Sequence, residues 1–158
     1  MAIVAFSEVI PSAVPAAKLF KANVLDAHIL SPKALPEIVA SATFLGDGGV
    51  GSVRQFNFTE VVPYGFIKER IDIIDNGKFM CKFTSIGGGD IGKKLETATS
   101  DIKVESTSDG GSIYMLSVEY IPLPGIDYSE ADIEGVKNAM VGMFKAIEGY
   151  LIANPNYV

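Results

Sequence analysis

Alternation of apolar and polar residues dominates the middle of the chain. Six runs repeat with a period of two, which is typical of half-buried strands. Short segments rich in glycine and aspartate, such as GDGG and SDGG, separate these runs and favour tight turns. Consecutive strands joined by tight turns form antiparallel hairpins. With a similar run near the N-terminus, the pattern predicts seven antiparallel strands, at 4–10, 38–45, 53–60, 65–74, 79–85, 95–105 and 112–121.

Prolines and an aspartate set the expected limits of the N-terminal elements. Pro11 is expected to end the first strand, and Pro15 opens the helical segment AAKLFKANVL, because proline is favourable in the first helical turn. Asp26 is placed to cap a second short helix, which Pro32 and Pro36 are expected to limit. The sequence therefore predicts two short helices between the first and second strands.

A longer helix is predicted at the C-terminal end. Ser129 and Asp132 have the spacing of a capping box, and apolar residues then recur at steps of three and four. The pair Asn154–Pro155 ends this pattern. About 24 helical residues would span roughly 36 Å, which is long for one domain of this size. The order of elements predicts an α+β fold in which this helix covers the sheet.

The alternation also assigns the inner face of the sheet. A helix is about 10 Å wide and cannot by itself fill the concave side of a wide, curled sheet. The pattern alone leaves two alternatives open, a core filled by side chains and an internal cavity. The positions assigned to the inner face are Phe56, Phe58, Ile67, Glu69, Ile71, Ile73, Phe79, Cys81, Phe83, Ala98, Ser100, Ile102, Val104, Tyr114, Leu116, Val118 and Tyr120.

Composition narrows the chemistry. The 158 residues carry 13 Lys and Arg against 19 Asp and Glu, a net charge of −6, so no nucleic-acid partner is expected. The single cysteine, Cys81, and the single histidine, His28, exclude an internal disulfide framework and a metal site with two imidazoles. We expect no metal and no cofactor. Cys81 is interpreted as a small core residue.

Apolar runs are too short for a bilayer span of about eighteen residues. Near the N-terminus, Glu8 and Pro11 interrupt the apolar run, and no basic segment precedes it. We therefore expect no membrane insertion and a cytoplasmic location, which a single reduced cysteine suits.

One glycine-rich loop resembles a phosphate-binding loop. In GDGGVGS, however, Ser52 stands where that motif has its lysine, and a strand follows in place of a helix. A rigid turn is therefore favoured, with weak anion binding at the surface left open. The loop residues are Gly46, Asp47, Gly48, Gly49 and Gly51.

Several motifs are spread over the whole chain: VPAAKLFKA at 14–22, LDAHILSPKALP at 25–36, GDGGVGSVR at 46–54, IKERID at 67–72, GSIY at 111–114 and EGYLIANPNYV at 148–158. Together they resemble the birch-pollen major allergen family, the class-ten pathogenesis-related proteins of plants. The resemblance implies one domain, 1–158, with a helix-grip fold: a curved seven-stranded antiparallel sheet around the long C-terminal helix, two short helices, and a large internal cavity.

The resemblance also implies a function. Family members hold amphipathic small molecules, such as cytokinins, flavonoids, sterols and fatty acids, so we expect an apolar or amphipathic ligand and a monomer linked to plant defence. Glu69 is the expected hydrogen-bonding residue, unless a tyrosine or a water satisfies it, and Glu8 is a weaker candidate. The cavity residues that the resemblance implies are Phe56, Phe58, Tyr64, Ile67, Glu69, Phe79, Cys81, Phe83, Ile91, Leu95, Ser100, Ile102, Leu116, Met140 and Met143.

Three other activities occur in this family or fold. A weak ribonuclease would use Glu96, Glu148 and Tyr150, although the acidic chain offers no groove for RNA. A cavity-based enzyme of specialised metabolism would need an interior lysine, and Lys137, on the flank of the helix, is the nearest option. A regulator of phosphatases, like the abscisic acid receptors, would need a gate loop with specific proline and leucine residues that the chain lacks.

Overall fold

A single antiparallel sheet of seven strands forms most of the molecule. The computed structural model describes residues 3–157. The strand order is β1-β7-β6-β5-β4-β3-β2, so β1 and β2 lie at the two edges, and all neighbours are antiparallel. The seven predicted strands are thus confirmed. They are β1 (Val4–Ser12), β2 (Val39–Leu45), β3 (Val53–Phe58), β4 (Phe66–Asp75), β5 (Met80–Gly88), β6 (Leu95–Ser106) and β7 (Ser112–Pro122).

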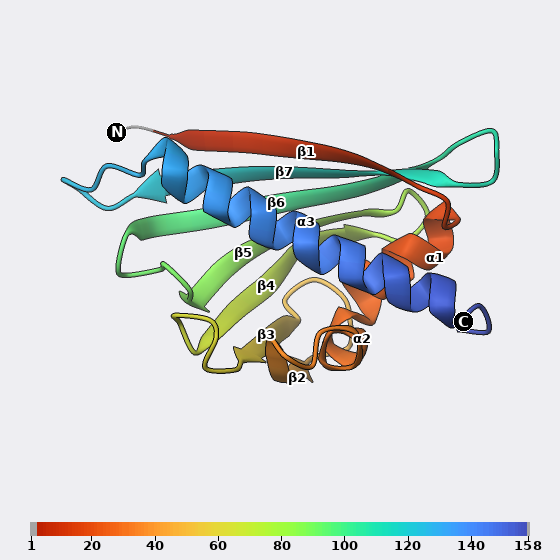
Figure 1. The fold of residues 1–158 in the computed structure, drawn as a ribbon. Coiled ribbons are helices and arrows are strands. Elements are labelled where there is room, and N and C mark those ends of the chain that lie inside the picture. Colours follow the sequence, from red (N-terminus) through yellow and green to blue (C-terminus); the bar gives the residue numbers. More distant parts are fainter. Residues whose placement is uncertain (1–2, 158) are drawn as a thin grey trace.

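Helices cover one side of this sheet. The long helix α3 (Glu130–Ala153) crosses the curved sheet diagonally, and its C-terminal end lies beside the short N-terminal helices (Figure 1). The length of 24 residues and the capping box of Ser129 and Asp132 are confirmed. The short elements are α1 (Ala16–Phe20), the π-helix η1 (Lys21–Leu25) and α2 (Ala27–Ala34).

Three predictions about the N-terminal elements are wrong. Pro11 does not end β1, which pairs with β7 as far as Ser12; proline is tolerated because β1 is an edge strand. Pro32 does not limit α2 but lies inside it. Proline removes one backbone hydrogen bond there, but its fixed φ is compatible with a helix. Asp26 occupies the N-cap position of α2 but makes no capping bond. Its carboxylate instead accepts a hydrogen bond from Tyr157 and pairs with Lys21 at 3.4 Å.

A β-bulge in β4 overturns one inner-face assignment. Ile71 pairs with Phe83, but the register then shifts, and Ile73 pairs with Lys82. The extra residue turns Ile73 outward, where 56% of its surface is exposed, and brings Ile74 against the core instead. Strict alternation cannot anticipate a bulge.

The packing of α3 changes along its length. Its fully buried residues, Phe144, Ile147 and Leu151, all lie in the C-terminal half. This half ends beside the short N-terminal helices (Figure 1). The Phe144 ring lies 4.5 Å from that of Tyr114 on β7. Earlier apolar residues on α3 pack against the core but are only partly buried: Ile133, Val136, Met140, Val141 and Met143. The helix is therefore tightly seated at one end and partly accessible at the other.

Candidate functional site between α3 and the sheet

The predicted cavity residues divide into a closed and a partly open group. Most of the buried ones lie in the main core below α3, whereas Phe56 belongs to a smaller cluster with Ala27 and Val39. Met143 packs against both clusters. The buried residues are Phe56, Cys81, Phe83, Leu95, Ile102 and Leu116. The partly buried ones are Phe58, Tyr64, Ile67, Glu69, Phe79, Ile91, Ser100, Met140 and Met143.

A buried ion pair stands on the inner face of the sheet. Arg54 on β3 and Glu69 on β4 are paired residues of adjacent strands, and the Nε of Arg54 donates to Oε1 of Glu69 at 3.1 Å. Their side chains are 8% and 17% exposed. Glu69 therefore has a partner that we did not predict, an arginine in place of a tyrosine or a water. The pair gives this apolar interior two opposite charges.

Further contacts fix the guanidinium of Arg54. Its centre lies 3.9 Å from the ring centroid of Phe83, a distance at which cation–π attraction is favourable. Its Nη1 donates to the carbonyl oxygens of Asn23 at 3.2 Å and Val24 at 3.5 Å, both in η1. The arginine thus ties the sheet to the π-helix.

Alternation contains the signal that would have found Arg54. It stands two residues before Phe56, so the period of two puts both on one face. The inner-face prediction for this strand names only Phe56 and Phe58, and arginine is rarely fully buried without a partner. The partner, Glu69, was already assigned to the inner face.

Two tyrosines on the inner face of β7 are also buried. Tyr114 and Tyr120 are 6% and 8% exposed, and burial raises the pKa of each phenol well above its usual value. Both hydroxyls therefore stay protonated at neutral pH and are able to donate hydrogen bonds. Leu116 and Val118 lie between them on the same face.

A pocket of about 230 Å³ opens at the rim, where the segment before β4 meets the end of β5. It includes two of the predicted residues, Tyr64 and Ile91. The Tyr64 ring also contacts that of Phe58, at 6.0 Å between centroids, which links the pocket to the inner face of β3. Burial, and then the charge of Asp90, raise the pKa of the Tyr64 hydroxyl. The remaining lining residues are Gly65, Phe66, Gly88, Gly89 and Lys93.

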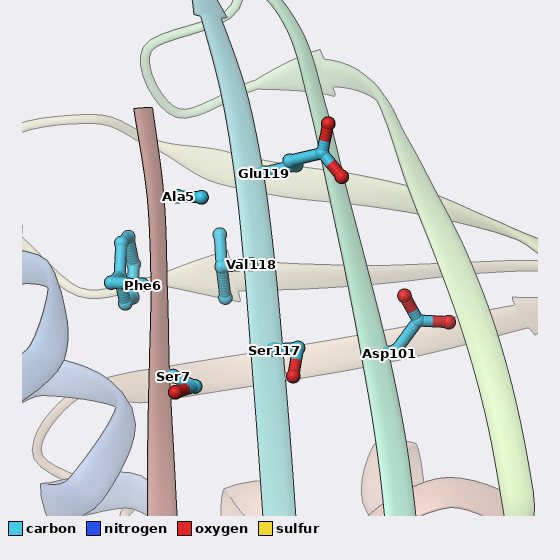
Figure 2. A pocket seen from close by; sticks show the side chains of 7 residues that line it. All are labelled: Ala5, Phe6, Ser7, Asp101, Ser117, Val118 and Glu119. Carbon is cyan, nitrogen blue, oxygen red and sulfur yellow. The ribbon is translucent and has the colours of Figure 1, made fainter. Parts of the chain in front are cut away.

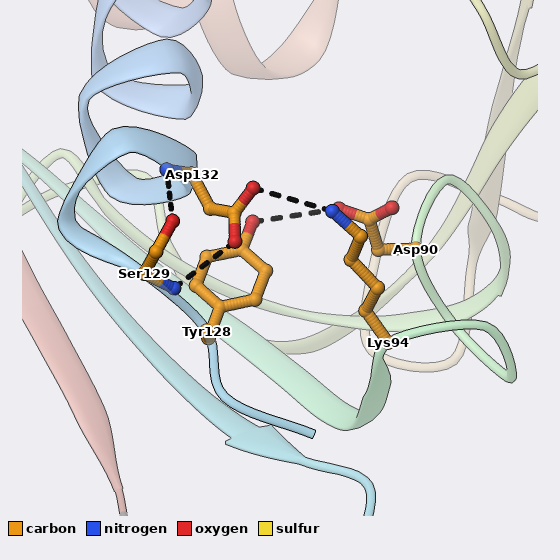
Figure 3. Close-up of polar contacts among 5 residues, drawn as sticks. All are labelled: Asp90, Lys94, Tyr128, Ser129 and Asp132. Carbon is orange, nitrogen blue, oxygen red and sulfur yellow. Dashed lines mark hydrogen bonds and ion pairs between the residues drawn. The ribbon is translucent and has the colours of Figure 1, made fainter.

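Polar contacts join this rim to the start of α3. Figure 3 shows that the Tyr128 hydroxyl points toward Asp90, to which it donates at 3.4 Å, while Lys94 pairs with Asp132 at 3.2 Å. Asp132 also accepts from the backbone N–H of Ser129, and this bond contributes most to lowering the pKa of its carboxyl group. The β5–β6 loop is thereby held against the N-terminus of the helix.

A second pocket, of about 300 Å³, lies on the outer side of the sheet. Figure 2 shows it over β1, β7 and β6, with the side chains of Ser7, Ser117, Asp101 and Glu119. These four residues are exposed. This pocket shares no residue with the predicted cavity lining.

Both pockets open at the surface, so neither of them is the predicted internal cavity. That cavity stays a prediction.

Cys81 lies on the inner wall of β5 and is 2% exposed. Burial is the main reason why its pKa rises to about 12. The thiol is therefore protonated at neutral pH, which does not favour a nucleophilic role.

The glycine-rich loop satisfies its own backbone donors. The N–H of Gly48 donates to Oγ of Ser52 at 3.0 Å, and that of Gly49 to Oδ1 of Asp47 at 2.8 Å. The N–H of Gly51 donates to the Ile71 carbonyl at 2.8 Å. These contacts favour the rigid turn over an anion site, because three donors of the loop already have partners.

The three ribonuclease candidates do not form one cluster. Glu96 is exposed near the start of β6, two residues from Lys94, which pairs with the first turn of α3. Glu148 lies 16 residues beyond Asp132, or about 24 Å along the helix, and pairs with Lys145 at 3.7 Å. Tyr150 follows on the last turns of α3. The structure thus separates the two carboxylates that a general acid–base pair would need together.

Residues 3–157 lack two further features. They contain no group of three or more His, Cys, Asp or Glu side chains arranged to hold a metal ion. Within the same range, no helix combines the length and the apolar character that a bilayer span requires.

Comparisons with known proteins agree with this architecture. Residues 3–154 match the pathogenesis-related protein Bet v 1 family. The chain belongs to the Bet v 1 family. Its Bet v 1 relatives include Pathogenesis-related protein 1 of Asparagus officinalis, which is 41% identical over 145 residues, 90% of this chain and 89% of the relative. Another is the major pollen allergen Aln g 1 of Alnus glutinosa, at 39% identity over 91% of both chains.

Solved structures show the same fold. Ara h 8.0201 superposes with a TM-score of 0.85 at 33% identity, covering 96% of this chain and 99% of its own. Norcoclaurine synthase of Thalictrum flavum has a TM-score of 0.80 at 20% identity, covering 96% of this chain and 87% of its own. That enzyme has also been solved with dopamine and hydroxybenzaldehyde bound. At 20% identity the likeness shows the fold alone. The predicted Bet v 1 family, curved sheet and helix order are confirmed.

Proposed function

We propose that this protein is an intracellular binding protein of plant defence. It holds an apolar or amphipathic small molecule, of cytokinin, flavonoid, sterol or fatty-acid type, between α3 and the inner face of the sheet. It acts by binding, as a monomer, and needs no metal or cofactor.

One observation carries this proposal: the uneven burial of α3. Its last turns are seated on the core by Phe144, Ile147 and Leu151. Met140 and Met143, just before them, pack against the core and remain only partly buried. When a ligand covers apolar side chains that are partly accessible beneath a helix, apolar surface leaves water, and this favours binding. Methionine side chains also adapt to ligands of different shape.

The rim pocket supports a route for the ligand. It lies where the Tyr64 segment and the β5–β6 loop meet, and the loop is held to α3 by Lys94–Asp132 and Tyr128–Asp90 contacts. The exposed ion pair at this point costs little to break. Opening of the loop would give a ligand access to Phe58 and the methionines.

The binding function is tested with the uncharged dye N-phenyl-1-naphthylamine, which fluoresces strongly in apolar surroundings. We expect saturable fluorescence enhancement, and competition by the cytokinin trans-zeatin or the flavonoid quercetin. Absence of dye binding and of direct calorimetric binding of both compounds at high micromolar concentrations would contradict the proposed function.

A pair of arginine substitutions locates the binding face. Phe58→Arg puts a charge on the inner wall of β3, so we expect loss of dye binding together with lower stability. Ile73→Arg is the matched control, because the bulge in β4 leaves this side chain on the outer face. It should bind the dye like the wild type. Equal loss in both variants would show that binding does not depend on the inner face.

A further inference from the structure

We propose that the Arg54–Glu69 pair makes the interior selective for uncharged ligands with N–H or O–H donors, such as aromatic amides and phenols, over carboxylates. This inference rests on the proposed function and narrows its ligand class. It assigns Glu69 the role of cancelling the attraction that Arg54 alone would exert on a carboxylate, so that the cost of desolvating an anion is not offset.

The position of the pair puts it in reach of a ligand under α3. Arg54 is held against Phe83, a fully buried residue at the centre of the inner face. Its charge and that of Glu69 both act on Tyr114 and Cys81, which stand on the inner sides of β7 and β5. The ion pair therefore lies within the interior and is not a bridge at the surface.

The hydrogen bonds of the pair leave a defined set of groups for a ligand. The guanidinium of Arg54 uses Nε toward Glu69 and Nη1 toward the carbonyls of η1. In the described part of the chain, these bonds leave Nη2 as a donor and Oε2 of Glu69 as an acceptor. An amide or a phenol complements both groups, because it carries a donor and an acceptor side by side. A carboxylate complements only the donor.

Charge strengthens this preference. A carboxylate that reaches Arg54 comes close to Glu69, which already balances the arginine, so it meets an acceptor of like charge in a poorly solvated place. Glu8 adds a second carboxylate on the inner side of β1, opposite Leu116. Lys137 of α3 lies over the Phe6 ring. Phe6 is on β1, which forms one edge of the sheet, whereas Arg54 is on β3, next to the other edge strand, β2. Glu8 and Lys137 therefore add no positive charge next to Arg54.

The test compares two ligands that differ by one charge. 2-Naphthamide and 2-naphthoate share a ring system and nearly the same shape. Isothermal titration calorimetry of the whole protein at pH 7.5 should show naphthamide binding at least about tenfold more tightly than naphthoate. In Glu69→Gln, Arg54 loses its counter-charge, so this ratio should fall about tenfold or reverse.

Two further variants complete the design. Glu105→Gln removes the carboxylate of an exposed ion pair with Lys103 and should keep the wild-type ratio. Glu69→Asp retains the negative charge and should also keep the preference for the amide. If Glu69→Gln does not fold, the wild type still decides, because naphthoate binding as tightly as naphthamide would overturn the selectivity.

Contradictory outcomes are distinct for the two proposals. Naphthoate binding as tightly as naphthamide to the wild type, or an unchanged ratio in folded Glu69→Gln, would overturn the selectivity while dye binding leaves the proposed function standing. Failure of the dye, of both naphthalene ligands, and of trans-zeatin and quercetin to bind would remove the proposed function itself.

Discussion

Replacing Arg54 by methionine is the sharpest test of the interior as described. The change keeps an unbranched apolar chain but removes the guanidinium that is 8% exposed, bonded to Glu69 and stacked on Phe83. Glu69, 17% exposed, would lose its counter-charge in a poorly solvated place. Removing one partner of a buried ion pair typically costs about 3–5 kcal/mol, and we expect a value near 3 because Glu69 retains some solvent contact.

Urea unfolding followed by circular dichroism measures this loss. Thermal unfolding followed by the same signal should show the melting temperature falling by roughly 10 °C, because each kcal/mol corresponds to about 2–4 °C for a chain of this size. The double variant Arg54→Met/Glu69→Leu should recover to within about 1 kcal/mol of the wild type, since replacing both charges by apolar groups is often neutral or stabilising.

A control on the outer face separates burial from charge. Lys103→Met breaks the exposed pair with Glu105, whose side chains are 46% and 53% exposed, and should change the free energy of unfolding by less than about 1 kcal/mol. If Arg54→Met is no more costly than Lys103→Met, or if the double variant is less stable than Arg54→Met, the account of the buried pair is refuted.

Three other changes test the fold around the site. A Cβ at Gly88, where φ is +73°, would lie 2.1 Å from the carbonyl oxygen of Phe66. At Gly110, φ is +87° and a Cβ would have no heavy atom within 4 Å, so Gly88→Ala should lower the free energy of unfolding more than Gly110→Ala. Equal losses by chemical denaturation would contradict this contact. Ser129→Ala removes the capping bond of α3 and should lower stability by about 1 kcal/mol in the same assay, whereas an unchanged midpoint would show that the cap is not needed. Burial is the main cause that lowers the pKa of His28 below 6.5 in the folded state. The unfolded chain therefore binds a proton more readily, and stability falls as the pH decreases from 6.5. His28→Gln should flatten this part of the plot of stability against pH, and identical plots for the variant and the wild type would refute the assignment.

The fold was predictable because its signals are local. Period-two runs separated by glycine-rich turns fix the hairpins, and the Ser129–Asp132 box fixes the start of the long helix. Pro11 and Pro32 were misjudged because their cost depends on tertiary context, an edge strand in one case and a short helix in the other. The bulge that turns Ile73 outward has no signal in the alternation.

The candidate site was predictable as a surface but not as a chemical environment. Alternation placed Glu69, Cys81 and Phe83 on the inner face, as observed, because side-chain direction follows from strand position. The pairing of Glu69 with Arg54 depends on the register of β3 against β4, which the turn sequence did not reveal. The expected large hollow depends on how side chains fill the interior, so it stays a prediction.

Methyl NMR of the methionines tests the central claim most directly. With ¹³C-methyl methionine, titration of the protein with 2-naphthamide should shift the signals of Met140 and Met143, which face the sheet from α3. Met80, 37% exposed, and Met115, which alternates outward between the buried Tyr114 and Leu116, should not shift. Shifts confined to Met80 or Met115, or binding without any change at Met140 and Met143, would contradict a ligand held between α3 and the sheet.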